Sequence, residues 1–169
     1  MKIYLASPWF CKSQAERETR VKEKLRNLGF EVHSPKEDSN ITGSIIDPEY
    51  RRKVFENNVD NIKSCDIIFG ITDGKLATSL EEDQVGNKLQ AIDPGTIFEC
   101  GYAYSLKHSG LKDIIIVYYA ETLGSNAFNL MLQESADIVI TSFEELDNLG
   151  EYIEEARKGN RKVYNGITE

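Results

Sequence analysis

The chain has 169 residues, of which 40% are hydrophobic, and this length predicts one domain with a sizeable core. Its formal net charge is −8 and its sequence pI is about 4.9. This negative charge argues against nucleic acid and anionic membrane surfaces as partners, so small neutral or cationic ligands fit better.

The cysteines and the N-terminal segment bear on localisation. Cys11, Cys65 and Cys100 are odd in number, lack CxxC spacing and lie beside apolar residues, which is typical of reduced core thiols in the cytosol. The opening residues MKIYLASPWF run directly into a polar segment, and no window approaches ~18 consecutive apolar residues. We therefore expect a cytoplasmic protein with neither a signal peptide nor a membrane span.

The first elements alternate strand and helix. A β-rich run predicts a strand over Lys2–Ala6. A helix is predicted over 14–28, because Ser13 and Glu16 have the spacing of a capping box and the apolar residues follow a helical period. A short strand over 30–33 comes next.

The middle of the chain holds the predicted centre of the sheet. A polar loop over 34–46 leads to a helix over 48–64, which an Asp-Pro pair opens. The run DIIFGIT at 66–72 is apolar on both faces, as in a central parallel strand covered by helices. The connection 73–92 is long and mixed in polarity, and loops of this length usually serve a function.

The alternation of strands and helices continues to the C-terminus. The remaining predicted elements are a helix over 94–107, strands over 113–118 and 137–140, a helix over 142–157 and a tail over 158–169, which by default is loosely held. The order predicts an α/β fold: a Rossmann- or flavodoxin-like parallel five-stranded sheet with helices on both faces, in one domain over 1–169.

One charged side chain, Glu99, interrupts the apolar segment from Pro94 to Leu106. It lies in the second turn of a helix that starts where open α/β sheets bind ligands, and the helix N-terminal field there favours an anion. This position suits a nucleophile or base, and it suits equally well a structural carboxylate bonded to the backbone or to an arginine. Asp93, by its position alone, fits a plain helix cap.

Other kinds of chemistry have weak signals or none. His33 and His108 lack the spacing of a metal motif, so we predict no metal site. The sequence contains no GxxxxGK[ST] or GxGxxG phosphate cradle and no GxSxG nucleophile elbow. Carboxylate chemistry without a cofactor remains.

Four stretches of the sequence together resemble the nucleoside 2-deoxyribosyltransferase family. They are KIYLASPWF at the start, IKSCDIIFG around the central strand, DPGTIFECGYA around Glu99, and NLM at 129–131. The resemblance covers nearly the whole chain, and the final VYNGITE looks like the family's C-terminal segment, which folds back near a site.

The resemblance implies a role for each of several residues. Glu99 would be the nucleophile, Tyr4 the hydroxyl that orients it, and Asp93 the acid/base that exchanges a proton with the nucleobase. Asn129, with Met131, would reach into a neighbouring subunit's site and contact the sugar. This implies a homo-oligomer built from dimer units, either a dimer or a hexamer.

Further substrate-binding residues follow from the same resemblance. Trp9 and Phe10 lie in the matched first turn, and Gly95 lies in the segment that bears Glu99. The family has an aspartate in the helix before the central strand, whereas the best-aligned residue here is Asn58, with Asp60 nearby. This departure bears on the choice of substrate.

The implied reaction explains why carboxylates are needed. An N-glycosidic bond breaks through an oxocarbenium-like transition state, which an ionised glutamate can stabilise and then trap as an ester, with overall retention. A protonated aspartic acid can serve the departing base and then the incoming one. The expected activity is exchange of bases between 2′-deoxyribonucleosides and free nucleobases. The alternatives are a nucleoside or nucleoside 5′-monophosphate N-glycosidase and a non-catalytic nucleotide-binding module.

Overall fold

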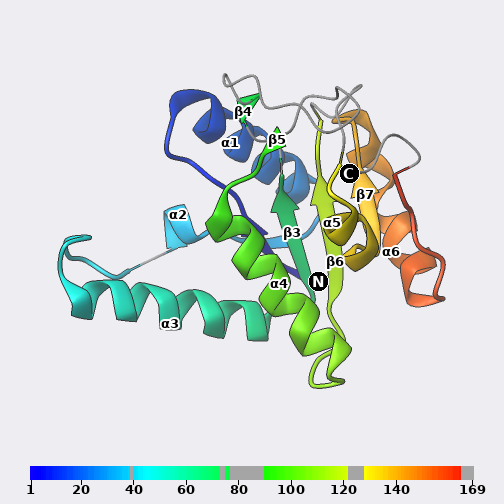
Figure 1. Ribbon diagram of the computed structural model, residues 1–169. Helices are drawn as coiled ribbons and strands as arrows, with labels where there is room; N and C mark the ends of the chain where they lie inside the picture. The colour runs from blue at the N-terminus through cyan, green and yellow to red at the C-terminus, as the bar shows by residue number, and fades with distance from the viewer. Residues whose placement is uncertain (39, 73–74, 77–89, 122–127, 165–169) are drawn as a thin grey trace, which may run out of the picture.

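Five parallel strands form the central sheet of the computed structural model, which describes residues 1–38, 40–72, 75–76, 90–121 and 128–164 (Figure 1). The strand order is β2-β1-β3-β6-β7, so the chain starts in the interior of the sheet and builds outward on both sides. The strands are β1 (Lys2–Ala6), β2 (Glu31–His33), β3 (Ile67–Ile71), β6 (Ile115–Tyr119) and β7 (Ile138–Ile140). The predicted five-stranded parallel α/β fold is confirmed.

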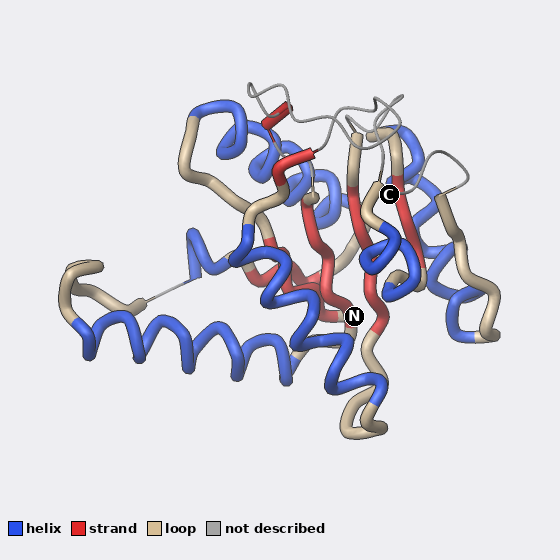
Figure 2. The backbone as a smooth tube through the Cα atoms, in the orientation of Figure 1, coloured by secondary structure: helices blue, strands red, loops and turns tan. Residues whose placement is uncertain are grey.

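Helices cover both faces of this sheet (Figure 2). They are α1 (Lys12–Asn27), α2 (Pro35–Asp38), α3 (Pro48–Ser64), α4 (Pro94–His108), α5 (Leu130–Ser135) and α6 (Leu149–Arg157), and a 3₁₀ helix, η1 (Glu144–Asn148), precedes α6. Buried residues of α1, η1 and α6 pack on one face, whereas α3, α4 and α5 pack on the other. The N-terminal half of α3 projects beyond the sheet (Figure 1).

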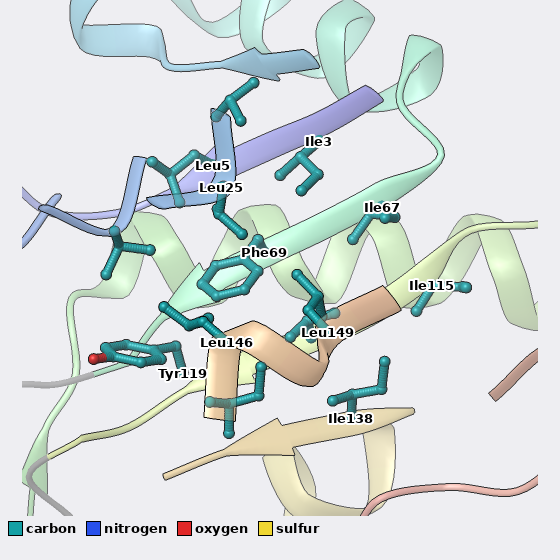
Figure 3. Packing of buried hydrophobic residues seen from close by; sticks show 14 of the residues in the cluster. Ile3, Leu5, Leu25, Ile67, Phe69, Ile115, Tyr119, Ile138, Leu146 and Leu149 are labelled. Atoms are coloured by element: carbon teal, nitrogen blue, oxygen red, sulfur yellow. The ribbon is translucent and has the colours of Figure 1, made fainter. Parts of the chain in front are cut away.

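The period-2 alternation of each strand divides the core into two layers. On the α1/α6 side, Ile3, Leu5 and Phe69 pack with Leu25 and Leu149 (Figure 3). The residues between them on β1 and β3 point to the opposite layer, where Tyr4, Ala6 and Ile68 lie against α3 and α4. Tyr4 is therefore fully buried, on the same face as the helix that carries Glu99.

Helix α1 begins two residues before its predicted start. Its N-cap is Cys11, and the Gln14 carboxamide oxygen accepts hydrogen bonds from the backbone N–H groups of Phe10 (3.0 Å) and Cys11 (3.2 Å). The predicted Ser13–Glu16 capping box is therefore wrong. A capping side chain that reaches back to the turn satisfies otherwise unpaired N–H groups just as well two residues earlier.

Two short helices were missed by the sequence patterns. The predicted loop 34–46 contains α2, and α5 lies between Asn129 and β7, where no element was predicted. Both are shorter than two turns, so neither shows a helical apolar period. Within 73–92, Lys75–Leu76 and Gln90–Ala91 form β4 and β5, which pair antiparallel, and most of that segment lies outside the described residues.

The described part of the tail is held by the fold, contrary to the default expectation of a loose tail. Lys162 pairs with Ile138 in a parallel bridge at the edge of β7, donating its N–H to the Asp137 carbonyl (2.9 Å). Tyr164 exchanges two hydrogen bonds with the Gln133 side chain of α5, at 2.9 and 3.3 Å. Residues 165–169 of the predicted tail lie outside the described residues.

The cysteine prediction holds for two residues and fails for the third. Cys65 and Cys100 are fully buried thiols, whereas Cys11, at the N-cap of α1, is half-buried. A residue in the turn ahead of a helix faces solvent on at least one side, which explains the difference. None of the described helices is long and apolar enough to cross a membrane.

Candidate active site

Glu99 meets two hydrogen-bond donors from different elements. The Tyr4 hydroxyl of β1 donates to Glu99 Oε1 at 2.6 Å, and the Asn58 amide of α3 donates to the same oxygen at 3.3 Å. The strand fixes the phenol because its ring is fully buried, and packing of α3 against α4 brings the amide within reach. The carboxylate is thus held from two sides beneath the second turn of α4.

Burial raises the pKa of Glu99 from its ordinary value to about 7. The neighbouring Asp93 carboxylate raises this pKa further, whereas the hydrogen bonds from Tyr4 and Asn58 lower it. From the sequence we expect the Tyr4 phenol and the helix N-terminal field to offset the effect of burial on Glu99, and the raised pKa shows that the offset is only partial. Burial beside Glu99 also raises the pKa of Tyr4, so the phenol stays protonated as a donor.

Asp93 is the N-cap of α4. Its Oδ2 accepts a hydrogen bond from the Thr96 backbone N–H at 2.7 Å and another from the Thr96 hydroxyl at 3.1 Å. Gly95 lies close to this oxygen, since a Cβ at Gly95 would approach Oδ2 to 3.0 Å. The prediction that Asp93 caps the helix is therefore confirmed. The charge of the same carboxylate also raises the pKa of Glu99.

A cavity of about 420 Å³ opens beside Glu99, between α3 and α4. Its α4 wall is formed by Gly95, Phe98 and Glu99. Its α3 wall is a stripe at helical spacing, which includes Phe55, Asn58, Val59 and Ile62. Arg51 of α3 also lines it, so this largely apolar hollow with one carboxylate, one amide and one guanidinium has the size and character of a small-ligand site.

Phe55 of α3 and Phe98 of α4 also line this cavity, and neither was predicted from the sequence to bind substrate. Their ring centroids lie 5.7 Å apart at 47°, and each side chain is 53% exposed. A signal was present, since Phe55, Asn58 and Ile62 recur at i, i+3 and i+7 in FENNVDNI. The spacing alone does not distinguish the wall of a cavity from an ordinary packing face of a helix.

The other predicted substrate-binding residues lie outside this cavity. Trp9 and Phe10 stack on each other in the turn between β1 and α1, with ring centroids 5.7 Å apart. Asn129 is the N-cap of α5, where its Oδ1 accepts from the Met131 backbone N–H at 3.0 Å, and the Met131 side chain is 70% exposed. The chain's own fold therefore brings together Tyr4, Asn58, Gly95 and Glu99, but not Trp9, Phe10, Asn129 and Met131.

The two histidines have separate surroundings. His33 packs against the Tyr4 ring at 5.6 Å, and His108 stacks on Tyr104 at the end of α4. Among the described residues, no group of three or more His, Cys, Asp or Glu side chains is placed to hold a metal ion. Among the described residues, the polar groups at the cavity are the Glu99 carboxylate, the Asn58 amide and the Arg51 guanidinium, with the Tyr4 phenol bonded to Glu99.

Comparisons with known proteins bear on the family and the fold. A family model described as nucleoside 2-deoxyribosyltransferase matches residues 3–150. The solved structure of a 2-deoxyribosyltransferase from the psychrotolerant bacterium Bacillus psychrosaccharolyticus superposes with a TM-score of 0.71 at 27% identity, covering 97% of this chain and 99% of that one. A conserved protein from Enterococcus faecalis V583 shares the fold, with a TM-score of 0.55 at 20% identity over 96% of this chain and 89% of that one. No curated protein sequence matches.

Fold and family match together define a pentosyltransferase, an enzyme that moves a pentose between acceptors. The chain belongs to the nucleoside 2-deoxyribosyltransferase family, and its substrates are accordingly nucleosides and nucleobases. The resemblance drawn from four short stretches of sequence is confirmed.

Proposed function

We propose that the protein exchanges the base of a 2′-deoxyribonucleoside through a covalent deoxyribosyl ester on Glu99, with retention of configuration. The observation that carries this proposal is a half-buried carboxylate that receives a 2.6 Å hydrogen bond from Tyr4 and borders a cavity. A carboxylate can stabilise the positive charge that develops at C1′ and then bond to that carbon.

The reaction consists of two displacements. A Glu99 oxygen attacks C1′ as the C1′–N bond breaks, and the electron pair of that bond passes to the base nitrogen, which takes a proton from Asp93. The second base then attacks C1′ from the opposite side, gives its proton to Asp93 and releases the Glu99 carboxylate. Two inversions at one carbon restore the original configuration.

Asp93 is proposed as the proton carrier because it starts the same helix and is close enough to raise the pKa of Glu99. Its two hydrogen bonds from Thr96 both reach Oδ2. These two hydrogen bonds hold Oδ2 in place and so set the orientation of the Asp93 carboxyl group. The base would occupy the site near Gly95, where the lack of a side chain leaves room beside the cap.

Asn129 and Met131 are proposed to complete the site of a neighbouring subunit, together with Trp9 and Phe10 of the chain that carries Glu99. Supporting this, Asn129 and Met131 lie on α5 outside the chain's own cavity, and Met131 is largely exposed. The described part of the tail packs beside them, because the Tyr164 ring contacts Phe128 edge-on at 6.1 Å. The single domain over 1–169 thus functions as a homo-oligomer, in the cytosol where Cys65 and Cys100 stay reduced.

The deciding experiment follows products by chromatography when the protein is incubated with a 2′-deoxynucleoside and a different free base. We expect a new nucleoside from the wild type and none from Glu99→Ala, because the variant lacks the nucleophile. Mass spectrometry of the quenched wild type should show one deoxyribosyl group on the peptide that contains Glu99. Normal exchange by Glu99→Ala would refute the mechanism.

Circular dichroism of Glu99→Ala provides the control, since the variant is expected to keep the wild-type spectrum. Free deoxyribose without exchange would instead support the N-glycosidase alternative, in which water captures the ester. Absence of turnover with every nucleoside offered would support the non-catalytic binding module.

A further inference from the structure

Both donors that reach Glu99 converge on one of its two oxygens. The Tyr4 hydroxyl and the Asn58 amide donate to Oε1, at 2.6 and 3.3 Å, and among the described residues no other hydrogen bond to this carboxylate is found. Oε2 thereby differs from Oε1, since the described part of the chain donates hydrogen bonds to Oε1 alone. Asn58 and Glu99 face each other across the cavity between α3 and α4.

We propose that Asn58 is a positioning residue for Glu99: with Tyr4 it fixes Oε1, so that Oε2 is presented to C1′ as the attacking oxygen. This role rests on the proposed function and is separate from the substrate contact that the family resemblance implied for Asn58. It accounts for the contact that joins the Asn58 amide to Glu99 Oε1 at 3.3 Å.

The neutral amide suits this position for an electrostatic reason. Besides Asn58, the titratable groups that interact with Glu99 are the Tyr4 phenol of β1, the Asp93 carboxylate at the start of α4 and the buried Cys100 thiol of α4. The Arg51 guanidinium of α3 lines the same cavity. The Arg51 guanidinium donates to the Ile45 and Ile46 carbonyls, at 2.9 and 3.3 Å.

An aspartate at position 58 would place a second carboxylate within hydrogen-bond distance of the first. Two carboxylates this close disfavour the ionised form of both, because one must keep a proton to relieve the repulsion. The amide donates a hydrogen bond without adding charge, and the hydrogen bond favours the ionised Glu99 that can attack.

The test measures pH–rate profiles of base exchange for the wild type, Asn58→Asp and Asn58→Ala. We expect the acidic limb of kcat/KM, which reports the free enzyme, to move upward by about one unit in Asn58→Asp and by less in Asn58→Ala, so that the Asn58→Asp rate well below the limb falls about tenfold. At high pH the Asn58→Asp rate recovers toward a plateau.

Asn57→Asp is the matched control. It adds the same charge one residue away on α3, where the backbone carbonyl of Asn57 accepts the Asn61 amide, and its acidic limb should stay at the wild-type position. An unshifted limb in Asn58→Asp, or an equal fall in rate at every pH, would overturn the positioning role.

A second readout separates this inference from the proposed function. Carbon-13 labelling of glutamate carboxyls, with Glu99→Gln to assign the signal, follows the titration of Glu99 by NMR without any turnover. A raised pKa of Glu99 in Asn58→Asp supports the role even if the wild type exchanges no bases. An unchanged titration curve contradicts it even if exchange is observed.

Discussion

Folding and the proposed reaction make opposite requirements of Glu99: burial favours the protonated carboxyl, whereas the reaction needs the ionised carboxylate. Burial raises the pKa of its carboxyl to about 7, so around neutral pH both the protonated and the ionised forms are populated. Two donors from β1 and α3 favour the ionised form, while desolvation and Asp93 disfavour it. The reactive form is thus the one that the fold tolerates less well.

This conflict predicts that Glu99→Gln stabilises the fold at alkaline pH. The native pKa of about 7 lies above the ordinary value of 4.5, so the native state binds more protons than the unfolded state between these values. The contribution of Glu99 to the free energy of unfolding is fully present below pH 4.5 and is lost as the pH rises through 7. Glutamine avoids that loss, and thermal unfolding at pH 8 should show a gain of about 1 to 3 kcal/mol.

The expected difference between Glu99→Gln and the wild type shrinks to the control level at pH 4. Glu23→Gln, at an exposed position of α1, serves as control and should show no such pH-dependent gain. A Glu99→Gln variant that unfolds earlier than the wild type at pH 8 would contradict the burial argument.

At the scale of elements, the contact between β3 and α4 determines the position of Glu99 relative to the sheet. Gly70 of β3 faces Cys100 of α4, and a Cβ at Gly70 would lie 2.7 Å from the Cys100 sulfur and 3.2 Å from the Tyr118 ring. Strand and helix therefore approach more closely than any side chain at this position allows. The residue next to Cys100 is Glu99, so this close approach sets the depth of the carboxylate.

We predict that Gly70→Ala destabilises the protein by about 1 to 3 kcal/mol, because the added methyl overpacks a core without free volume. Urea denaturation measures the loss. The double variant Gly70→Ala/Cys100→Ala should lose less free energy of unfolding than the sum of the losses in the two single variants, since Cys100→Ala removes the sulfur that the added methyl meets. Gly150→Ala in α6, where a Cβ meets nothing within 4 Å, is the control and should be neutral or stabilising.

The same elements show what sequence patterns can and cannot predict. β3 and α4 were predictable because a run of five apolar residues and an Asp-Pro opening are local signals. The α1 start was misplaced because the choice between Cys11 and Ser13 as N-cap depends on how Gln14 folds back on the turn. The Asn58–Glu99 contact joins residues 41 positions apart, and no local pattern encodes a distance across two packed helices.

At the scale of the molecule, the face formed by α3, α4 and α5 carries much of the exposed apolar surface. Phe55, Phe98, Tyr104, Leu130 and Met131 are each between 39% and 70% exposed there. The projecting half of α3 extends this face beyond the sheet (Figure 1). Such a surface supports the proposed sharing of sites between subunits.

Subunit sharing predicts that two inactive variants restore each other. Glu99→Ala lacks the nucleophile, and Asn129→Ser lacks the long amide while retaining a hydroxyl that can cap α5. After subunit exchange in an equal mixture, a site that takes Glu99 from one chain and Asn129 from the other is intact. About a quarter of the wild-type exchange activity should return, as random pairing in a two-fold dimer requires.

Mixing each variant with itself is the control and should restore nothing. Sedimentation of the wild type should show at least a dimer at the assay concentration. A monomer with full activity, or a mixture that stays inactive although its subunits exchange, would contradict the assignment of Asn129.

The unequal burial of the three cysteines also makes the protein selectively labellable. Cys65 and Cys100 are sealed in the core, and burial raises the pKa of both thiols, whereas Cys11 reaches solvent at the start of α1. A thiol-reactive fluorophore will therefore attach at Cys11, directly after the stacked Trp9 and Phe10. The native sequence thus provides an optical reporter of events in the turn after β1, with no cysteine added or removed.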